Sequence, residues 1–253
     1  MTPLTRRSFL KLATLTFAGA AAALTADPVK TALAGESTEA RAWFSAPRGS
    51  RRIALTFDDG YVNVSHLLDA ALAAGVRLTL FPTGKVILAN PQLWRRAVDE
   101  GHEIGCHTFS HAALGALTYD GVAAELAQWR SVARDQLGLV QPRFLRPPYG
   151  DGWNAEAVQR AAKAQGFQIV MWNRVNTMKQ RATAPTSVDV LNSFVDEAQA
   201  GDIVLYHFHW QEVAAFPAIV AYARAQGWKV TTVGELLTPR PAAQARLTSA
   251  TRP

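Results

Sequence analysis

The sequence predicts an α/β protein with a sheet of about seven parallel strands. Short apolar runs typical of buried strands alternate with longer segments of helical period over residues 51–238. This alternation favours a parallel sheet, because each helix returns the chain to the edge where the previous strand began. Several of the strands run directly into polar residues, which indicates where a functional site would lie.

The individual elements follow from these runs in chain order. We expect strands at 52–57, 76–81, 103–107, 144–146, 168–172, 203–207 and 229–232. The intervening segments predict helices at 64–74, 91–100, 120–137, 154–165, 187–200 and 213–226. Glycines at 75, 101, 166 and 227 stand where helices should end, as is typical of helix C-caps.

The N-terminus predicts export. Thr5-Arg6-Arg7-Ser8-Phe9-Leu10-Lys11 fits a twin-arginine signal, and an apolar run over 12–24 follows it. That run is too short to span a bilayer comfortably, so we expect cleavage of residues 1–34 after Ala34 and no stable membrane anchor. The alternative is an uncleaved segment lying at the membrane interface. Residues 35–50 would form an extended lead-in, 51–238 a single domain, and 239–253 a disordered tail.

The charge and the cysteine content limit the classes of protein to which the chain can belong. The chain has 26 Lys and Arg against 20 Asp and Glu, and without residues 1–34 the balance becomes 22 against 19, a net charge of +3. No basic run or aromatic pattern suggests nucleic acid. Cys106 is the single cysteine, so no internal disulfide can form. We expect it to be a small buried side chain, with a redox-sensitive thiol or an auxiliary metal ligand as the alternatives.

Two adjacent acids end the first of the predicted strands. Asp58 and Asp59 follow the apolar run 52–57, and Gly60 permits the sharp turn after them. Because side chains alternate along a strand, the two carboxylates should point in different directions. One can therefore bind a metal ion while the other stays available to activate water. The alternative is a plain turn closed by an Asx hydrogen bond.

Two histidines four residues apart complete a candidate metal site. His107 and His111 have the spacing that places two imidazoles on one side of a helical turn. Two imidazoles and one carboxylate leave coordination positions open for water and substrate, which is typical of a catalytic rather than a structural zinc site. The alternative is a pair of solvated or core-capping imidazoles.

Two further strand ends carry residues suited to catalysis. Pro147 and Pro148 fix φ in the turn that follows the strand at 144–146, and such a rigid loop can hold Arg146 and a backbone N–H over a site. The strand at 203–207 ends in His207, which is well placed for a general acid.

These segments resemble the motifs of the NodB-homology polysaccharide deacetylases, carbohydrate esterase family 4. The matching segments, in family order, are Thr56-Phe57-Asp58-Asp59-Gly60, His107-Thr108-Phe109-Ser110-His111, Arg146-Pro147-Pro148-Tyr149, the region of Trp172, and Leu205-Tyr206-His207. The resemblance covers roughly residues 50 to 237. It implies a distorted, incomplete (β/α) barrel, in which active sites form at the C-terminal ends of the strands.

The resemblance also implies a role for each matching residue. Asp59, His107 and His111 would bind one divalent metal, zinc by default, with cobalt, nickel or manganese as alternatives. Asp58 would be the general base and His207 the general acid. Arg146 would orient Asp58, and the Tyr149 backbone N–H would stabilise the oxyanion. Leu205, Tyr149 and Trp172 would contact the substrate.

The fourth motif departs from the family pattern. Trp172 is kept, but Asn176, Lys179 and Gln180 stand where acids and a second tryptophan are expected. Arg146 therefore loses its usual carboxylate partner, and we expect Asn173 or Asn176 to accept a hydrogen bond from it instead. The missing second tryptophan leaves the acetyl pocket less well defined.

The resulting prediction is a periplasmic or extracellular, metal-dependent deacetylase. It would hydrolyse N-acetyl groups on amino sugars of peptidoglycan, chitin-like or other envelope polysaccharide. The alternatives are an O-acetyl sugar esterase, a hydrolase of non-sugar amides, and a carbohydrate-binding relative without turnover. We expect a monomer whose partners are the acetylated glycan and, during export, the twin-arginine translocase.

Overall fold

The computed structural model describes residues 40–46, 49–175 and 185–238. Several of the sequence predictions lie outside these residues. They are the signal segment 1–34, part of the lead-in at 35–39 and 47–48, the tail 239–253, and Asn176, Lys179 and Gln180 of the fourth motif.

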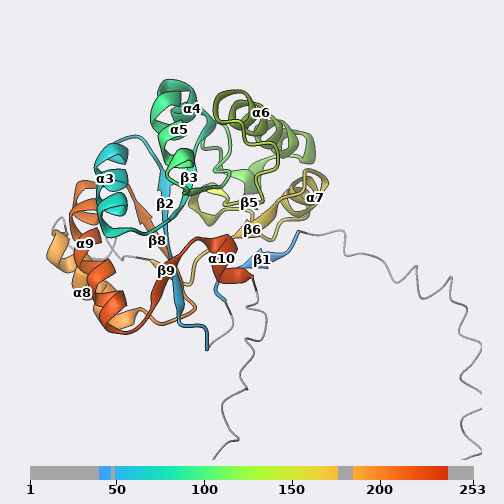
Figure 1. Cartoon of the computed structure of the whole chain (residues 1–253). Helices are drawn as coiled ribbons and strands as arrows, with labels where there is room; N and C mark the ends of the chain where they lie inside the picture. The colour runs from blue at the N-terminus through green and yellow to red at the C-terminus, as the bar shows by residue number, and fades with distance from the viewer. Residues whose placement is uncertain (1–39, 47–48, 176–184, 239–253) are drawn as a thin grey trace, which may run out of the picture. The chain divides into compact units, whose positions relative to one another are not determined.

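The strands form two parallel sheets (Figure 1). The larger sheet has the order β4 (Glu103–Ile104), β3 (Thr79–Pro82), β2 (Arg52–Asp59), β8 (Ile203–His207) and β7 (Arg174–Val175), and β9 (Lys229–Thr231) also pairs with β2. The smaller sheet has the order β1 (Ala42–Trp43), β6 (Gln168–Val170) and β5 (Phe144–Leu145). β2 is the longest strand, and it pairs with three others.

Single bridges connect the two sheets. A parallel bridge between Cys106 and Leu145 joins the end of β4 to β5, and an antiparallel bridge between Ser45 and Asp202 joins the segment after β1 to the start of β8. β6 pairs in the smaller sheet and β7, a few residues later, in the larger one. The described strands therefore form a distorted and incomplete barrel rather than a closed one.

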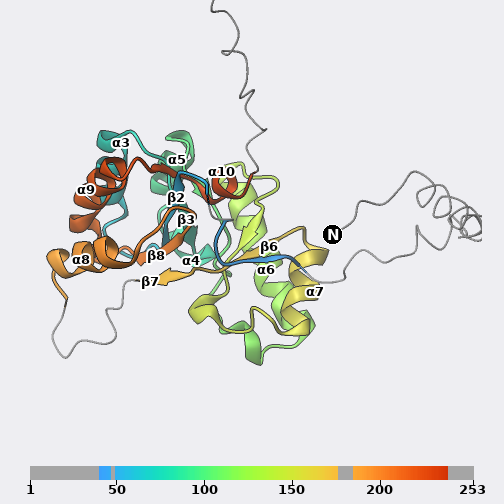
Figure 2. The same cartoon turned by 90° about the horizontal axis from the view of Figure 1, so that it is seen from below.

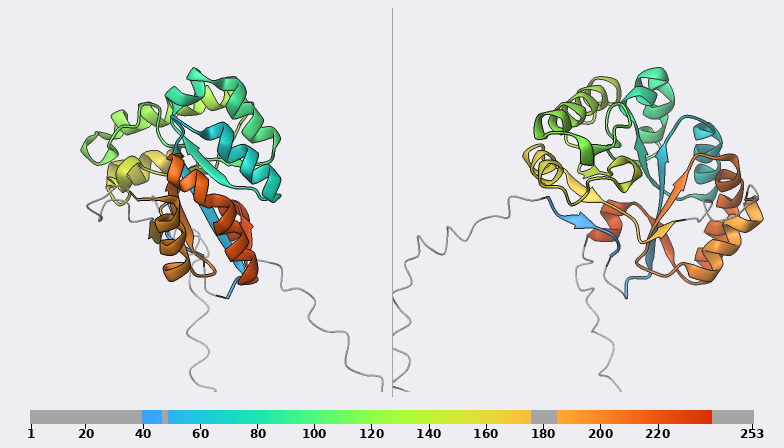
Figure 3. Two further views of the ribbon diagram at one scale, coloured as in Figure 1. Left: turned by 90° about the vertical axis from the view of Figure 1, so that its left-hand side faces the viewer. Right: turned by 180° about the vertical axis from the view of Figure 1, so that it is seen from behind.

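Helices lie around the outside of the strands (Figures 1 and 3). They are α3 (Val64–Ala74), α4 (Gly84–Ala89), α5 (Pro91–Asp99), α6 (Tyr119–Leu137), α7 (Glu156–Ala164), α8 (Ser187–Glu197), α9 (Trp210–Ala225) and α10 (Val233–Leu237), with 3-10 turns at Leu114–Ala116 and Pro148–Gly150. Seen from below, α6 and α7 lie on one side and α8 and α9 on the other (Figure 2). None of these described helices has the length and apolar character needed to cross a membrane.

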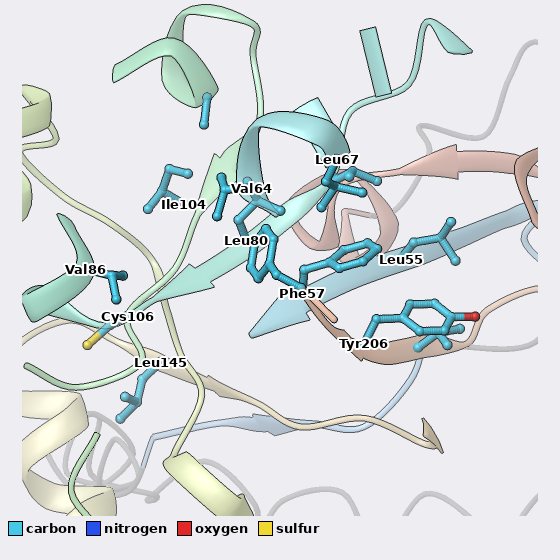
Figure 4. Close-up of a cluster of buried hydrophobic side chains, with 14 of the residues drawn as sticks. Leu55, Phe57, Val64, Leu67, Leu80, Val86, Ile104, Cys106, Leu145 and Tyr206 are labelled. Atoms are coloured by element: carbon cyan, nitrogen blue, oxygen red, sulfur yellow. The ribbon is translucent and has the colours of Figure 1, made fainter. Parts of the chain in front are cut away.

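Strand alternation divides the core into two clusters. Leu55 and Phe57 of β2 point outward and pack with Val64 and Leu67 of α3 (Figure 4). A smaller inner cluster between the sheets contains Ala46, Ala54, Phe81, Phe144, Val170, Ile203, Val233 and Leu236. Thr56 and Asp58 share the inward face of β2 with Ala54, so the polar end of this strand continues directly from the inner core.

The structure confirms most of the predicted architecture. All seven predicted strands are present, β8 with the predicted bounds and the others with shifted, shortened or extended ends, and each of the six predicted helices is found. The sequence missed β1 and β7, which have two residues each, and the short helices α4 and α10. The predicted helical turn at 107–111 is wrong, because Thr108 and His111 have φ values of 63° and 68° and this segment is an irregular loop.

Gly60 is required by its surroundings as well as by its backbone. Its φ is 90°, and a Cβ atom at this position would lie 2.3 Å from Cζ2 of Trp94, a fully buried side chain. We expect Gly60→Ala to lower the free energy of unfolding by about 2–4 kcal/mol, from the positive φ and the overpacking together. Urea unfolding followed by circular dichroism measures this change.

Gly75→Ala is the matched control. Gly75 also has a positive φ, 60°, but nothing lies within 4 Å of the added Cβ. This variant should lose only about 1–2 kcal/mol, the cost of the left-handed conformation. Equal losses in the two variants would contradict the packing argument.

His102 makes the stability of the fold depend on pH. Burial lowers its pKa below the ordinary value of 6.5, with the carboxylate of Glu100 opposing this effect, and its Nδ1 accepts a hydrogen bond from the backbone N–H of Leu78. The unfolded chain therefore takes up this proton first on acidification, so the stabilising contribution present above pH 6.5 is lost as the pH falls toward the folded pKa. His102→Gln should reduce the slope of unfolding free energy against pH in that window. Identical slopes for variant and wild type would contradict this assignment.

Candidate active site

The two adjacent acids at the end of β2 are separated by a change in backbone conformation. Asp58 keeps the strand conformation and is buried, with 3% of its surface exposed, whereas Asp59 has a φ of 77° and is partly exposed. Gly60 continues the turn with a φ of 90°. The two carboxylates consequently have different neighbours: Asp58 contacts Arg146, and Asp59 contacts His107 and His111.

Backbone strain is concentrated around these residues. Five non-glycine residues in the described ranges have positive φ, and four of them are Asp59, Thr108, His111 and Tyr149. Each such residue costs of the order of 1–3 kcal/mol, and strain of this kind persists where the surrounding structure holds it. The concentration at one end of the sheets supports a functional role for this region.

Glu125 on α6 holds the loop that carries both histidines. Its carboxylate accepts hydrogen bonds from the backbone N–H groups of Phe109 and Ser110, at 3.0 and 2.9 Å, and from the Ser110 hydroxyl at 2.7 Å. Thr108 Oγ1 accepts a further bond from the Ala112 N–H. These contacts replace the helical hydrogen bonds that the spacing of His107 and His111 had suggested.

Asp59, His107 and His111 converge on one point. Oδ1 of Asp59 lies 3.4 Å from Nε2 of His107 and 3.0 Å from Nε2 of His111. The three ligand atoms fit within the spacing of a metal-binding group. His111 comes from the end of an irregular loop rather than from a helix, yet the imidazoles still lie together, with ring centroids 5.0 Å apart.

The protonation of His107 favours a cation at this point. Its Nδ1 lies 2.8 Å from the backbone oxygen of Arg146, which can only accept, so Nδ1 carries the proton and Nε2 presents a lone pair in the neutral ring. Oδ1 of Asp59 is buried and makes no hydrogen bond of good geometry. Lone pairs facing one another without a proton between them fit a divalent metal ion, and the bond from Nδ1 is a common support for a metal-binding histidine.

Electrostatics at Asp59 are consistent with a permanently charged ligand. Burial would raise the pKa of Asp59, but the imidazoles of His107 and His111 outweigh this effect and bring the pKa below its ordinary value. The carboxylate is thus ionised at neutral pH, as metal binding requires.

Arg146 and Asp58 form a buried ion pair. Nη1 of Arg146 donates to Asp58 Oδ1 at 2.8 Å and to Thr56 Oγ1 at 2.7 Å, and both charged side chains are almost fully buried. Burial lowers the pKa of Arg146, although the charge of Asp58 opposes the shift. The second oxygen of Asp58, Oδ2, lies 4.0 Å from Nε2 of His107 and so faces the metal-binding group.

The predicted hydrogen bond from Arg146 to Asn173 is wrong. The remaining guanidinium N–H groups donate to the backbone oxygens of Val170 and Met171, each at 3.0 Å. Asn173 instead donates to Asp202 at 2.7 Å and accepts from the Ile203 N–H at 3.0 Å. Backbone carbonyls thus take the place that an acidic partner was expected to fill, while Asn176 lies outside the described residues.

His207 lies beside Asp58 on the neighbouring strand. The two residues are direct partners in the parallel register of β2 and β8, so their side chains point to the same face of the sheet. Burial lowers the pKa of His207 below its ordinary value, and the charges of Asp58 and Asp59 oppose the shift. The His207 N–H donates to Oε2 of Glu212 at 2.9 Å, which fixes the end of β8.

The three predicted substrate contacts surround this group of residues. Tyr149 is 72% exposed, and its hydroxyl lies 3.1 Å from Nδ1 of His111. Leu205 is two residues before His207 on the same face of β8 and is buried. Trp172 follows β6 and lies against the Tyr149 turn, because a Cβ at Gly150 would be 3.0 Å from its ring.

Cys106 does not belong to the site. It is fully buried in the outer core, and burial raises the pKa of its thiol strongly. A thiol in this environment is unreactive at neutral pH, which confirms the prediction of a buried filler over a redox-sensitive group.

Sequence analysis missed three residues that hold the site. Thr56 lies within the first motif, but its hydroxyl bond to Arg146 needs the tertiary structure to be recognised. Glu125 and Glu212 come from helices, where an isolated acid gives no signal distinct from a solvated surface charge. The burial of Glu212, only 2% exposed, is unusual for a glutamate and marks it once the fold is known.

Comparison with known proteins gives consistent matches. A family model described as polysaccharide deacetylase matches residues 45–170. A peptidoglycan-N-acetylglucosamine deacetylase from Bacillus cereus is 31% identical over 200 residues, covering 77% of this chain and 92% of that protein. The chitin deacetylase structure from Colletotrichum lindemuthianum has a TM-score of 0.72 at 25% identity, covering 80% of this chain and 94% of that one.

A structure of a CE4 family pseudoenzyme from Bacillus anthracis also matches. Its TM-score is 0.72 at 21% identity, covering 78% of this chain and 69% of that one. At this identity the match shows a shared fold alone.

Glu125→Ala tests whether the loop contacts matter for metal binding. The substitution removes the acceptor of two N–H groups and a hydroxyl without touching a metal ligand. We expect zinc affinity to fall by about 10–100-fold, the usual effect of removing a group that supports metal ligands. Competition with a chromophoric chelator measures the affinity. Glu156→Ala, at an exposed position on α7, is the control, and equal affinities for the two variants would contradict the role of Glu125.

Proposed function

The chain belongs to the NodB-homology, carbohydrate esterase 4 family of polysaccharide deacetylases, and we propose that it hydrolyses N-acetyl groups on amino sugars of peptidoglycan. One observation supports this proposal above all. Asp59, His107 and His111 converge on one point, beside a second carboxylate, Asp58, that is paired with Arg146. The peptidoglycan relative at 31% identity supports the choice of polymer.

A divalent metal would be held by Asp59, His107 and His111. Zinc is the default ion for two imidazoles and a carboxylate, and cobalt, nickel or manganese suit the same donors. When bound, such an ion lowers the pKa of water and polarises the acetyl carbonyl. The free lone pairs of Asp59 Oδ1 and His107 Nε2 support this assignment, as does the position of His111 beside them.

Asp58 would act as the general base toward the attacking water. Its Oδ1 is held by Arg146, so only Oδ2, which faces His107, is directed toward the metal-binding group. A carboxylate fixed in this way accepts the water proton without reorienting. Arg146 would be a positioning residue, because its guanidinium contacts Asp58 and backbone oxygens on the inner side of the sheet.

His207 would protonate the leaving amine. Its place beside Asp58 in the strand register puts the base and the acid on the same end of the sheet. The Tyr149 N–H would share the negative charge that develops on the carbonyl oxygen. Leu205, Tyr149 and Trp172 would contact the acetylated sugar.

The proposed deacetylation would take place outside the cytoplasmic membrane. The twin-arginine pattern at Arg6 and Arg7 supports export through the twin-arginine translocase, with removal of residues 1–34. A periplasmic or extracellular location gives the protein access to an envelope polymer. No nucleic acid partner is expected, and the proposed working unit is a monomer.

Acetate release with matched variants tests this function. Metal-loaded protein should release acetate from N-acetylated peptidoglycan, lose this activity on chelation, and regain it with zinc. Asp58→Asn should lower kcat by at least about 100-fold, because general-base catalysis contributes about 10²–10⁴-fold, while zinc binding persists. Asp69→Asn, an exposed aspartate on α3, is the control and should behave as wild type.

The substrate panel separates the alternatives. Release from chitooligosaccharides alone would assign a different polymer, and release from acetyl-xylan would indicate an O-acetyl esterase. Release only from simple non-sugar acetamides would indicate an amide hydrolase. Glycan binding by zinc-loaded protein without any release would indicate a carbohydrate-binding relative. An unchanged kcat in Asp58→Asn would refute the assignment of the base.

A further inference from the structure

A second group of metal-binding side chains lies at the end of β8. His207, His209 and Glu212 each place a ligand atom within 4.8 Å of the others. None of the three belongs to the first group, Asp59, His107 and His111, whose ligand atoms also lie within 4.8 Å of one another. Two imidazoles and one carboxylate again provide the donor types that zinc binds.

The backbone places both histidines on one side of the chain. Phe208 between them is buried, and its ring packs 5.6 Å from that of Phe57 and 6.1 Å from that of Trp94. In an extended segment, alternate side chains point in opposite directions, so His207 and His209 face away from this aromatic core. Their ring centroids lie 5.6 Å apart with a tilt of 38°.

His209 is available to a ligand. It is exposed and occupies the N-cap position of α9, but its side chain makes no capping hydrogen bond. Its backbone is extended, with φ of −67° and ψ of 147°. The imidazole can therefore rotate toward His207 without breaking a helix contact.

Glu212 is held against the same point by its surroundings. It lies in the first turn of α9, and its Oε2 accepts the His207 N–H at 2.9 Å. Metal-binding carboxylates are typically held by a hydrogen bond of this kind, since one carboxylate can accept a hydrogen bond from an N–H group and bind a cation at the same time. The His207 backbone and the Glu212 side chain are thus already coupled.

We propose that His207, His209 and Glu212 form a second, weaker divalent-cation site that inhibits the enzyme when filled. Binding through the His207 imidazole occupies the nitrogen that would otherwise carry the proton for the leaving group. This consequence rests on the proposed function of His207, whereas the site itself does not. Affinity should be lower than at the first site, because the exposed His209 side chain must be ordered on binding. A cation already bound at the first site would also repel a second one.

Zinc titration tests the site without reference to activity. Isothermal titration calorimetry of the full chain with zinc chloride should show two events, each with one ion per chain. His209→Gln should lose the weaker event and keep the tighter one, and Asp59→Asn should show the reverse. His66→Gln removes another exposed histidine, on α3, and should keep both events. A single event in wild type, or two unchanged events in His209→Gln, would refute the site.

Activity measured across the same titration tests the inhibition. Wild-type turnover should peak with one equivalent of zinc and fall by about 100-fold or more as the weaker site fills, the loss expected without a general acid. His209→Gln should match wild type at one equivalent and keep its rate at higher zinc. Equal inhibition of the two proteins would refute the regulatory role. Absence of turnover in every protein would refute the proposed function, and calorimetry would still decide whether the second site exists.

Discussion

Arg146 is the residue on which both halves of the site depend. Its side chain holds Asp58, while its backbone oxygen accepts the Nδ1 proton of His107 and so directs Nε2 toward Asp59. Removing one partner from a buried ion pair of this kind costs about 3–5 kcal/mol, because the other charge is left without compensation. The proposed general base and His107 of the proposed metal-binding group therefore take their positions from one residue directly after β5.

The burial of this arginine explains why the surrounding backbone is arranged as it is. A buried guanidinium must satisfy its N–H groups, and here Asp58, Thr56 and the carbonyl oxygens of Val170, which ends β6, and of Met171 accept them. These acceptors come from both sheets, across the region where only single bridges join them. The ion pair thus connects the two sheets at the end where the proposed catalytic groups lie.

Adjacent acids with separate roles are the second constraint. Alternation along a strand already turns Asp59 away from Asp58. Asp59 also has a positive φ, and its carboxylate lies beside His107 and His111. His111 and Thr108 adopt the same strained region of φ, so the proposed metal ligands are brought together by backbone conformations that helices and strands do not use. Glu125 stabilises this arrangement from α6.

The buried Arg146 and the strained backbone around Asp59 explain which features could be predicted from the sequence. Buried strands and amphipathic helices follow from local periodicity, which is why the bounds of β8 and α3 were predicted correctly and those of β2 with a small error. Spacing alone, however, suggested a helix for His107 and His111, because irregular loops with positive φ have no periodic signal. Apart from Asp58, the acceptors of Arg146 could not be predicted either: backbone oxygens have no sequence signature, and the search for another side-chain partner led to Asn173.

His207 shows how one position can serve both proton transfer and metal binding. A general acid near a cation must keep its imidazole nitrogen free of that cation, which requires the metal ligands to be complete without it. Asp59, His107 and His111 would meet this requirement, but the ligand atoms of His209 and Glu212 also lie within 4.8 Å of that of His207. Which chemistry prevails then depends on the free metal concentration, because the lone pair of one imidazole nitrogen binds either a proton or a metal ion.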